Sequence, residues 1–175
     1  VKSDPGSLID NFRHFLANDY KDMPKNRGEL WNLATFNNLL YIHMEDSLLL
    51  TKGKQTMTMK DGTEAFIGSG DIFAQDPDEL LQTEEGYGGT SSQFSTLITK
   101  YGYFFIDKRN GKVFIANQKL VEVSKNGMEN WLRENIDDEK WNYRLPDSPI
   151  LGSGFVSGWD EKNDRILLTK RALLP

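Results

Sequence analysis

The sequence predicts a mainly β protein with short helices, built from repeated β-hairpins that resemble the blades of a β-propeller. Three stretches, which begin at Asn38, Tyr103 and Phe155, share one layout: an apolar run, a polar turn and a second apolar run. In the last two, the turn opens with Asp107 and Asp160, which lie 53 residues apart. Propeller blades repeat every roughly 40 to 50 residues, so repetition of one sheet unit is the main signal of this chain.

The two later hairpins also share their turn chemistry. Gly111 and Asp164 each lie four residues after the turn aspartate, and a cation then starts the returning strand. An Asp side chain at the start of a turn accepts hydrogen bonds from the turn backbone. We therefore expect Asp107 and Asp160 to have structural roles.

The amino-terminal part predicts one helix and a connector. Residues 4–7 have the composition of a helix start, and apolar residues recur with helical spacing from Leu8 to Leu16, so a short amphipathic helix should end near Asn18. Residues 19–28 are rich in turn formers and predict an exposed connector. We assign residues 1–28 to this helix and connector, and residues 29–175 to a β-rich, propeller-like region.

Short strands follow from Trp31 onward. Residues 39–43 should pair with 48–51, and residues 56–60 with 64–67 through the Asp61-Gly62 turn. The Gly- and Ser-rich stretch 86–92 predicts a flexible, exposed loop that a neighbouring subunit could grip. Residues 120–123 predict a third strand in the sheet of the Tyr103 hairpin.

One further helix is predicted before the last hairpin. Ser124 or Asn126 should cap it, and the apolar face should carry Met128, Trp131, Leu132 and Ile136 and pack on the sheet. Pro146 and Pro149 then place a blade boundary near residues 145–150. Trp31, Trp131, Trp141 and Trp159 are candidate interface anchors, with core packing favoured for Trp131 and Trp159.

Composition excludes several classes of protein. The chain has 175 residues, no cysteine and two histidines, His14 and His43, so disulfide frameworks and structural zinc sites are disfavoured. We expect His14 on the surface of its helix and His43 half-buried in a strand. No apolar stretch reaches the ~20 residues of a membrane span, and the start at Val1 is no signal peptide. The start at Val1 and the end just after a strand suggest a piece of a longer polypeptide.

Charge is distributed unevenly along the chain. No basic residue lies between Lys60 and Lys100, whereas eight acidic residues do. Such an acidic block would repel phosphate, so direct nucleic-acid binding is not expected. A solvated face is the favoured interpretation, and the alternatives are a patch for a basic partner or a calcium site. The calcium ligands would be Asp71, Asp76, Asp78 and Glu79, although their spacing matches no EF-hand loop.

Motifs of catalysis are not recognisable. The glycines at 68–70 and 86–89 lack the residues that complete a phosphate-binding or dinucleotide-binding loop. Ser91 and Ser92 lack the flanking glycines of a nucleophile elbow, and neither histidine belongs to a recognisable triad. We assign no catalytic, cofactor-binding or metal-binding residues, and predict that the chain is not an enzyme. A glycosidase pair of carboxylates stays open, since its spacing cannot be measured from sequence.

A family resemblance runs through five blocks in order. They read G-E-L-W-N-L-A-T-F-N-N-L-L-Y-I-H-M-E-D-S-L-L-L-T, then I-G-S-G-D-I-F, then D-P-D-E-L-L-Q-T-E-E-G-Y-G-G-T-S-S-Q-F, then Y-G-Y-F-F-I-D-K-R-N-G-K-V-F-I, then N-G-M-E-N-W-L. Together they resemble the large virion proteins of crAss-like and related tailed bacteriophages, known as stabilisation or tail-muzzle proteins. The resemblance covers roughly residues 19–171.

This resemblance implies a structural, non-enzymatic component at the distal end of a short phage tail. Expected partners are other copies of the chain and neighbouring tail proteins, with synthesis in the cytoplasm of the bacterial host and final location in the virion tail. No cofactor and no membrane span are implied. The alternative functions are a β-propeller module that binds or cleaves host glycans, and an intracellular propeller adaptor.

Overall fold

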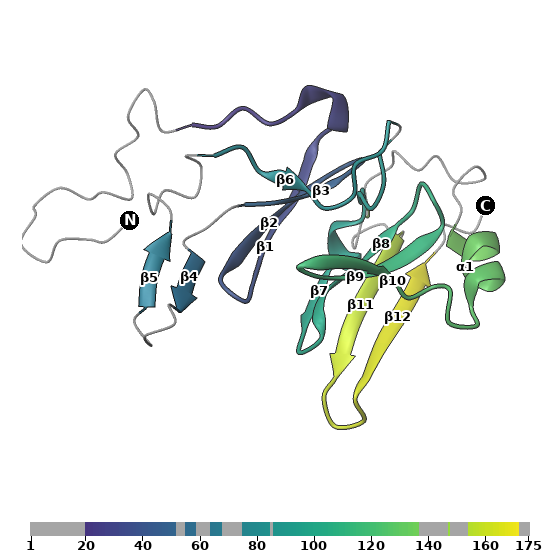
Figure 1. Ribbon diagram of the computed structural model, residues 1–175. Coiled ribbons are helices and arrows are strands. Elements are labelled where there is room, and N and C mark those ends of the chain that lie inside the picture. Colours follow the sequence, from purple (N-terminus) through teal and green to yellow (C-terminus); the bar gives the residue numbers. More distant parts are fainter. Residues whose placement is uncertain are drawn as a thin grey trace, which may run out of the picture.

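The computed structural model describes residues 20–51, 55–58, 64–67, 75–84, 86–136, 147 and 154–171. These residues form antiparallel sheets, short 3-10 helices and one α-helix (Figure 1). The predicted helix that ends near Asn18, the Asp61-Gly62 turn, Trp141 and the two boundary prolines lie outside the described residues.

The first sheet has the strand order β1-β2-β3-β6. Its strands are β1 (Leu30–Phe36), β2 (Leu39–Met44), β3 (Leu48–Leu50) and β6 (Asp78–Glu79). The predicted pairing of residues 39–43 with 48–51 is confirmed, because Tyr41 lies opposite Leu50. Asn37 and Asn38 join β1 to β2 with φ of 51° and 61°, the left-handed pair that a two-residue type I′ turn needs.

The second sheet is a meander with the order β10-β9-β8-β7. Its strands are β7 (Leu97–Thr99), β8 (Gly102–Asp107), β9 (Lys112–Asn117) and β10 (Lys119–Glu122). The predicted third strand at residues 120–123 is confirmed as β10, which pairs with β9. The second sheet therefore takes four consecutive strands from a short stretch of chain.

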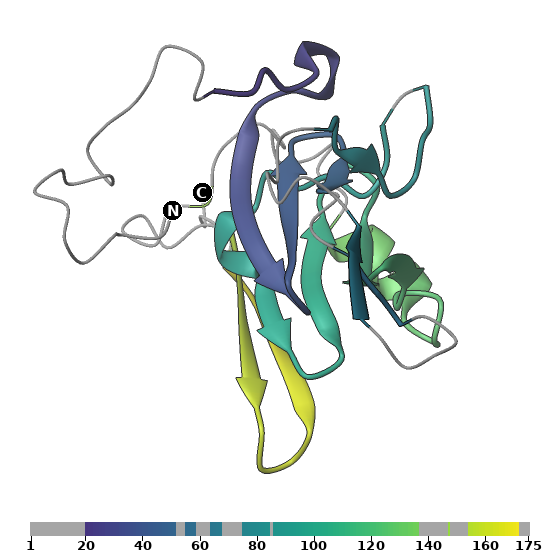
Figure 2. The ribbon, with the colours of Figure 1, turned by 60° about the vertical axis from the view of Figure 1, so that its left-hand side comes forward.

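Two hairpins complete the strands. The C-terminal hairpin consists of β11 (Gly154–Asp160) and β12 (Arg165–Arg171). In Figures 1 and 2 its tip projects beyond the ends of the neighbouring strands. A small hairpin of β4 (Gln55–Thr58) and β5 (Glu64–Ile67) confirms the pairing predicted for that region.

The repeated turn chemistry is confirmed in both later hairpins. Asp107 Oδ1 accepts a hydrogen bond from the Asn110 backbone N–H at 3.0 Å. The equivalent bond joins Asp160 Oδ1 and the N–H of Asn163 at 3.2 Å. The residue before the returning strand is left-handed in both turns, with φ of 60° at Gly111 and 53° at Asp164. The two hairpin turns therefore have the same hydrogen bond and the same backbone conformation.

The sheets are stacked as layers, and the second sheet lies in the middle. One face packs on the first sheet through a cluster that includes Tyr41, Phe105 and Phe114. The other face packs on the C-terminal hairpin and on α1 (Glu129–Ile136), through a cluster that includes Phe104 and Leu132. All six residues of β8 are buried as a result. The described strands form no closed ring, so the predicted propeller is not confirmed.

Some expectations about exposure are wrong. Residues 88–92 of the predicted exposed loop are buried, because their polar groups bond to both sheets. His43 is fully buried rather than half-buried. Trp131 is 52% exposed, because α1 packs on the sheet through Leu132 and Ile136 alone. Trp159 is half-buried against the ring of Tyr101.

One further expectation needs correction, and another is largely confirmed. Ser124 does not cap the helix, since its hydroxyl donates to Glu122 Oε1 at 2.9 Å. The predicted exposed connector is exposed at residues 20, 22 and 24–26, and contacts the first sheet through Met23 and Arg27. It forms a 3-10 helix, η1 (Lys25–Arg27), whose Arg27 bonds to the carboxylate of Glu79 and the carbonyl of Thr83.

Candidate interaction sites

A buried polar network joins the two stacked sheets where the chain crosses from one to the other. The crossing segment, residues 86–92, follows β6 and leads to the 3-10 helix η2 (Gln93–Ser95) and β7. Thr90 donates its backbone N–H to Met44 O and its hydroxyl to Ile106 O, at 3.2 and 2.6 Å. One residue thereby bonds to β2 and β8, and this fixes the relative position of the sheets.

His43 lies at the centre of this network. Its Nδ1 is 3.0 Å from the Tyr103 hydroxyl, and its Nε2 is 3.2 Å from the Gly88 carbonyl oxygen. A neutral ring satisfies both bonds when Nε2 donates to Gly88 and Nδ1 accepts from Tyr103. Burial lowers the pKa of His43 to about 3, with the carbonyls of Gly88 and Gly89 acting in the opposite direction.

Two residues near His43 also carry shifted pKa values. Burial raises the pKa of the Tyr103 hydroxyl to about 12, although Asn32 donates a hydrogen bond to it at 3.2 Å. Burial likewise raises the pKa of Asp107, against the hydrogen bonds from Asn110 and from the N–H of Gly88. Desolvation is the main cause in each case, which is typical of a packed interior.

A second group of buried polar side chains links the crossing segment to Asp147. The Ser92 hydroxyl donates to Asp147, and Lys108 Nζ lies 2.7 Å from the same carboxylate. The side chains of Lys108 and Asp147 are 5% and 2% exposed. Burial of a paired Lys and Asp is tolerated only where geometry and further hydrogen bonds compensate for lost hydration.

This arrangement does not resemble a nucleophilic site in the part of the chain that is described. A catalytic serine needs a base that takes its proton. The Asp147 carboxylate is held by Lys108, and both ring nitrogens of His43 bond to Tyr103 and Gly88. The network can position backbone and exclude water, which are structural tasks.

The acidic residues considered as calcium ligands are dispersed where they are described. Asp76 pairs with Lys21 at 2.5 Å, and Glu79 pairs with Arg27 at 3.0 Å. Asp78 is an exposed residue of β6, and Asp71 lies outside the described residues. Among described side chains, no three His, Cys, Asp or Glu residues are grouped as metal ligands would be.

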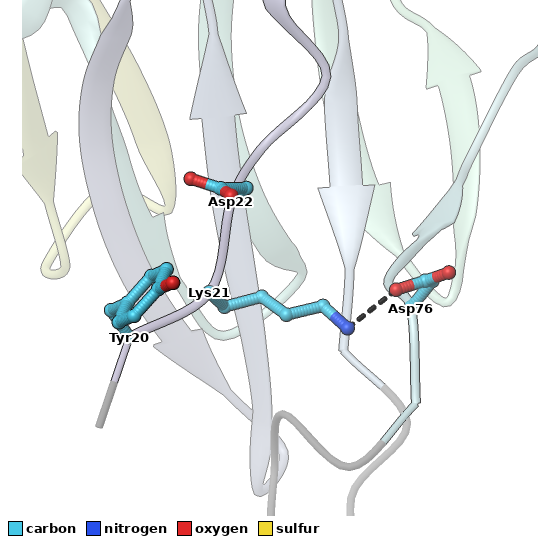
Figure 3. A pocket seen from close by; sticks show the side chains of 4 residues that line it. All are labelled: Tyr20, Lys21, Asp22 and Asp76. Atoms are coloured by element: carbon cyan, nitrogen blue, oxygen red, sulfur yellow. Dashed lines mark ion pairs between the residues drawn. The ribbon is translucent and has the colours of Figure 1, made fainter. Parts of the chain in front are cut away.

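An open polar cleft of about 430 Å³ surrounds the Lys21–Asp76 pair. Figure 3 shows Tyr20, Lys21 and Asp22 from the amino-terminal segment and Asp76 from the segment before β6. Tyr20 is 73% exposed.

An apolar groove of about 450 Å³ lies between α1, β9 and β12. The residues that line it include Val113 of β9, Val123 just after β10, Ile166 and Leu168 of β12, Met128 just before the helix and Trp131 on the helix. Met128 and Trp131 are each 52% exposed. Helical spacing predicts both on a packed face, but the eight-residue helix buries only Leu132 and Ile136. No pattern in the sequence shows how much of this face the sheet covers.

Within the described residues, no helix has the length and apolar character required to cross a bilayer. The molecule is thus defined by stacked antiparallel sheets, a polar network that fixes their spacing, and an apolar groove at the surface. These features define a mainly β protein whose interior polar groups hold its sheets together.

Comparison with known proteins assigns the chain to one family. A family model described as crassvirus muzzle protein matches residues 1–172. The chain belongs to this family, which confirms the phage resemblance seen in the sequence. Muzzle proteins are structural virion components.

A curated relative with the same description supports the assignment. The chain is 21% identical over 167 residues to the muzzle protein of Bacteroides phage crAss001. The match covers 94% of this chain and 11% of that protein. The chain therefore spans about a ninth of the length of this relative.

Proposed function

We propose that this chain is part of a non-enzymatic structural protein of a phage tail, and that it acts by binding neighbouring subunits. The observation that carries the proposal is the match of the muzzle family to residues 1–172. The geometry agrees with it, because the described polar interior fixes sheets against one another rather than presenting reactive groups. A rigid stack of sheets is suited to transmitting load.

The finer architecture that we propose is a series of propeller-like blades within residues 29–175. The first and second sheets each have four antiparallel strands, and β11 and β12 would be the middle strands of a third blade. The boundary near residues 145–150 separates the second blade from the third. Residues 1–28 would be an accessory segment that attaches to the first sheet through Arg27.

The partners we propose are further copies of this chain and other tail proteins. The protein would be made in the host cytoplasm and incorporated into the virion tail. Imaging purified particles at high resolution tests this: the sheets should be found at the tail, in several copies about its axis. Absence of this density from tails that contain all other virion proteins would refute the proposal.

A host-glycan-binding module is the second candidate. The cleft lined by exposed Tyr20, by Asp22 and by the Lys21–Asp76 pair supports it (Figure 3), because aromatic and polar side chains together line sites for small ligands. Binding of the purified chain to an array of bacterial surface glycans tests the idea. Loss of a glycan signal on Tyr20→Ala, with no change on Tyr101→Ala, would favour this candidate. Tyr101 is a comparable exposed tyrosine outside the cleft.

A further inference from the structure

The C-terminal hairpin is an incomplete sheet in the described part of the chain. The first and second sheets each contain four strands, whereas β11 and β12 pair only with each other there. The matched turns make β11 equivalent to β8 and β12 equivalent to β9. In the second sheet, the edge of β9 that faces away from β8 is covered by β10. A strand equivalent to β10 would therefore pair with the corresponding edge of β12.

The apolar groove lies beside this edge. β11 packs against β7 and η2, so β12 is the strand that borders α1 (Figure 1). The groove floor is formed by residues such as Phe104 and Val113. At one end, Lys170 Nζ donates to the Asn135 carbonyl and joins β12 to the helix. A strand paired with residues 165–169 would lie along the groove and cover its apolar walls.

The second sheet indicates which side chains such a strand would carry. In β10, Leu120 and Val121 lie opposite Ala116 and Ile115, and Glu122 follows them. Glu122 accepts from Lys112 Nζ at 3.4 Å. Burial alone would raise the pKa of Glu122, but hydrogen bonds from Lys125 and Ser124, and the charge of Lys112, lower it. The Glu is thus ionised in its pairing with β9.

Arg165 is the counterpart of Lys112 at the start of β12. Its side chain is 60% exposed and contacts Asp160 at 2.9 Å. An added strand with two aliphatic residues followed by a glutamate would reproduce the β9–β10 pairing, with its carboxylate diagonal to Arg165. Opposite charges across neighbouring strands favour pairing.

We propose that the edge of β12 that no described strand covers, together with the adjoining groove, binds an extended strand of a neighbouring tail protein, with the pattern aliphatic-aliphatic-Glu. This inference deepens the proposed function and rests on it only for the identity of the partner as a tail protein. Backbone hydrogen bonds along β12 supply affinity, and the groove and Arg165 supply specificity, as in other cases of strand addition.

A second copy of β12 is a poor occupant of the same edge. Antiparallel pairing of two β12 strands would bring Arg165 of one copy near Lys170 of the other, at both ends of the pair. Like charges on facing strands are destabilising, and cations at a sheet edge oppose self-association. Charge therefore selects an acidic strand from a different protein segment.

A peptide-binding experiment tests the inference with the purified 175-residue chain. The probe is a fluorescent peptide with the β10 sequence Q-K-L-V-E-V-S, and the control peptide has lysine in place of its glutamate. Fluorescence anisotropy should show saturable binding of the probe, and binding of the control about tenfold weaker, equivalent to about 1.4 kcal/mol. The variant Trp131→Asp should weaken probe binding by a similar factor.

Leu33→Asp is the matched control variant, because Leu33 is 56% exposed and lies outside the groove. It should bind the probe as the parent chain does, and thermal melts should show that both variants are folded. If Trp131→Asp does not fold, Met128→Asp replaces it, since Met128 is equally exposed and precedes the helix.

Three results of binding and hydrogen-exchange measurements would overturn the inference, and a fourth comes from an additional variant. They are no binding of the probe, equal binding of both peptides, and amide protection of β12 in the free chain equal to that of β9, which would show the edge already occupied. Dimerisation lost on Arg165→Glu would also contradict it. None of these measurements involves a virion, so a failed strand-binding test leaves the proposed tail function standing, and the reverse also holds.

Discussion

His43 is a neutral imidazole enclosed between two sheets, and its chemistry makes stability depend on pH. Its pKa is lowered to about 3 in the folded chain, compared with 6.5 for the ordinary side chain. Between these values the unfolded chain binds a proton that the folded chain does not. Stability should therefore decrease as pH falls through this window, by up to about 1.4 kcal/mol per pH unit.

Replacing His43 by glutamine should flatten this dependence. Glutamine is neutral throughout and has a donor and an acceptor that suit Gly88 and Tyr103. Urea unfolding of parent and variant at several pH values from about 5 to 7 measures the slope. Burial raises the pKa of Asp107, so its contribution to stability decreases as pH rises above 3.8, which is opposite to the effect of His43. Parent and variant both retain Asp107, so the difference between their slopes is due to His43.

His14→Gln is the control, because His14 is the other histidine of the sequence. It should retain the slope of the parent chain. An identical slope for parent and His43→Gln would contradict the neutral, buried state assigned to His43.

Two aspartates with the same turn role should differ in their effect on stability. Asp107 is 2% exposed and accepts bonds from the N–H groups of Gly88 and Asn110. Asp107→Ala leaves these buried donors unpaired and should lower the free energy of unfolding by about 2–3 kcal/mol. Asp160→Ala, in the exposed turn, should have a much smaller effect. Equal losses in urea unfolding would contradict this argument.

At the scale of the elements, the crossing segment of residues 86–92 depends on a glycine that permits close approach. A Cβ atom at Gly89 would lie 2.1 Å from the Glu45 carbonyl oxygen. Both groups belong to backbone that is held by hydrogen bonds, such as that from the Thr90 N–H to Met44. The segment and the β2–β3 turn are therefore fitted to each other.

Gly89→Ala should separate this contact and destabilise the chain by about 1–3 kcal/mol. Gly158→Ala on β11 is the matched control, because no atom of the described residues beyond its chain neighbours lies within 4 Å of a Cβ there. It should change stability by less than about 0.5 kcal/mol. Thermal unfolding of the two variants and the parent measures both changes in stability. An unchanged midpoint for Gly89→Ala would show that the backbone at Glu45 can move away without cost.

Local elements were predictable from sequence, whereas their burial was not. The hairpins at Asp107 and Asp160 follow from turn residues and alternating apolar runs, which act over a few positions. The crossing segment looks exposed by composition, but it is buried because distant residues such as His43 and Asp107 supply partners for its polar groups. Composition contains no information about such long-range pairing.

The groove was missed for a related reason. Helical spacing places Trp131 on the same face as Leu132, but spacing does not state how much of that face the sheet covers. The C-terminal hairpin covers the inner strands of the second sheet and leaves Trp131 at the edge of a gap. The family could be inferred from ordered sequence blocks, and its match to residues 1–172 confirmed that inference.

At the scale of the whole molecule, the second sheet belongs to two cores. Phe105 contributes to the cluster shared with the first sheet, and Ile106 contributes to the cluster shared with the hairpin and α1. Neighbouring residues of one strand therefore couple three layers. If either neighbouring layer separates from β8, apolar side chains of this strand become exposed to water. Loss of one layer therefore weakens the packing of the other.

The layers should therefore unfold in one transition. Circular dichroism of the backbone and fluorescence of tryptophans in different layers, Trp31 and Trp159, should give coincident urea curves. Ile106→Ala should lower both midpoints together, by an amount equivalent to about 2–5 kcal/mol. Separate midpoints for the two probes would show that the layers are independent.

The Lys108–Asp147 pair has a consequence for the order of events during synthesis. Both strands that flank the Lys108 turn leave the ribosome well before Asp147, the carboxylate that lies 2.7 Å from the lysine in the finished fold. A nascent chain can assemble the second sheet from neighbouring strands before the Asp147 carboxylate is available. The Lys108–Asp147 ion pair is therefore completed late in biogenesis, although the sheet that carries the lysine is among the most local parts of the chain.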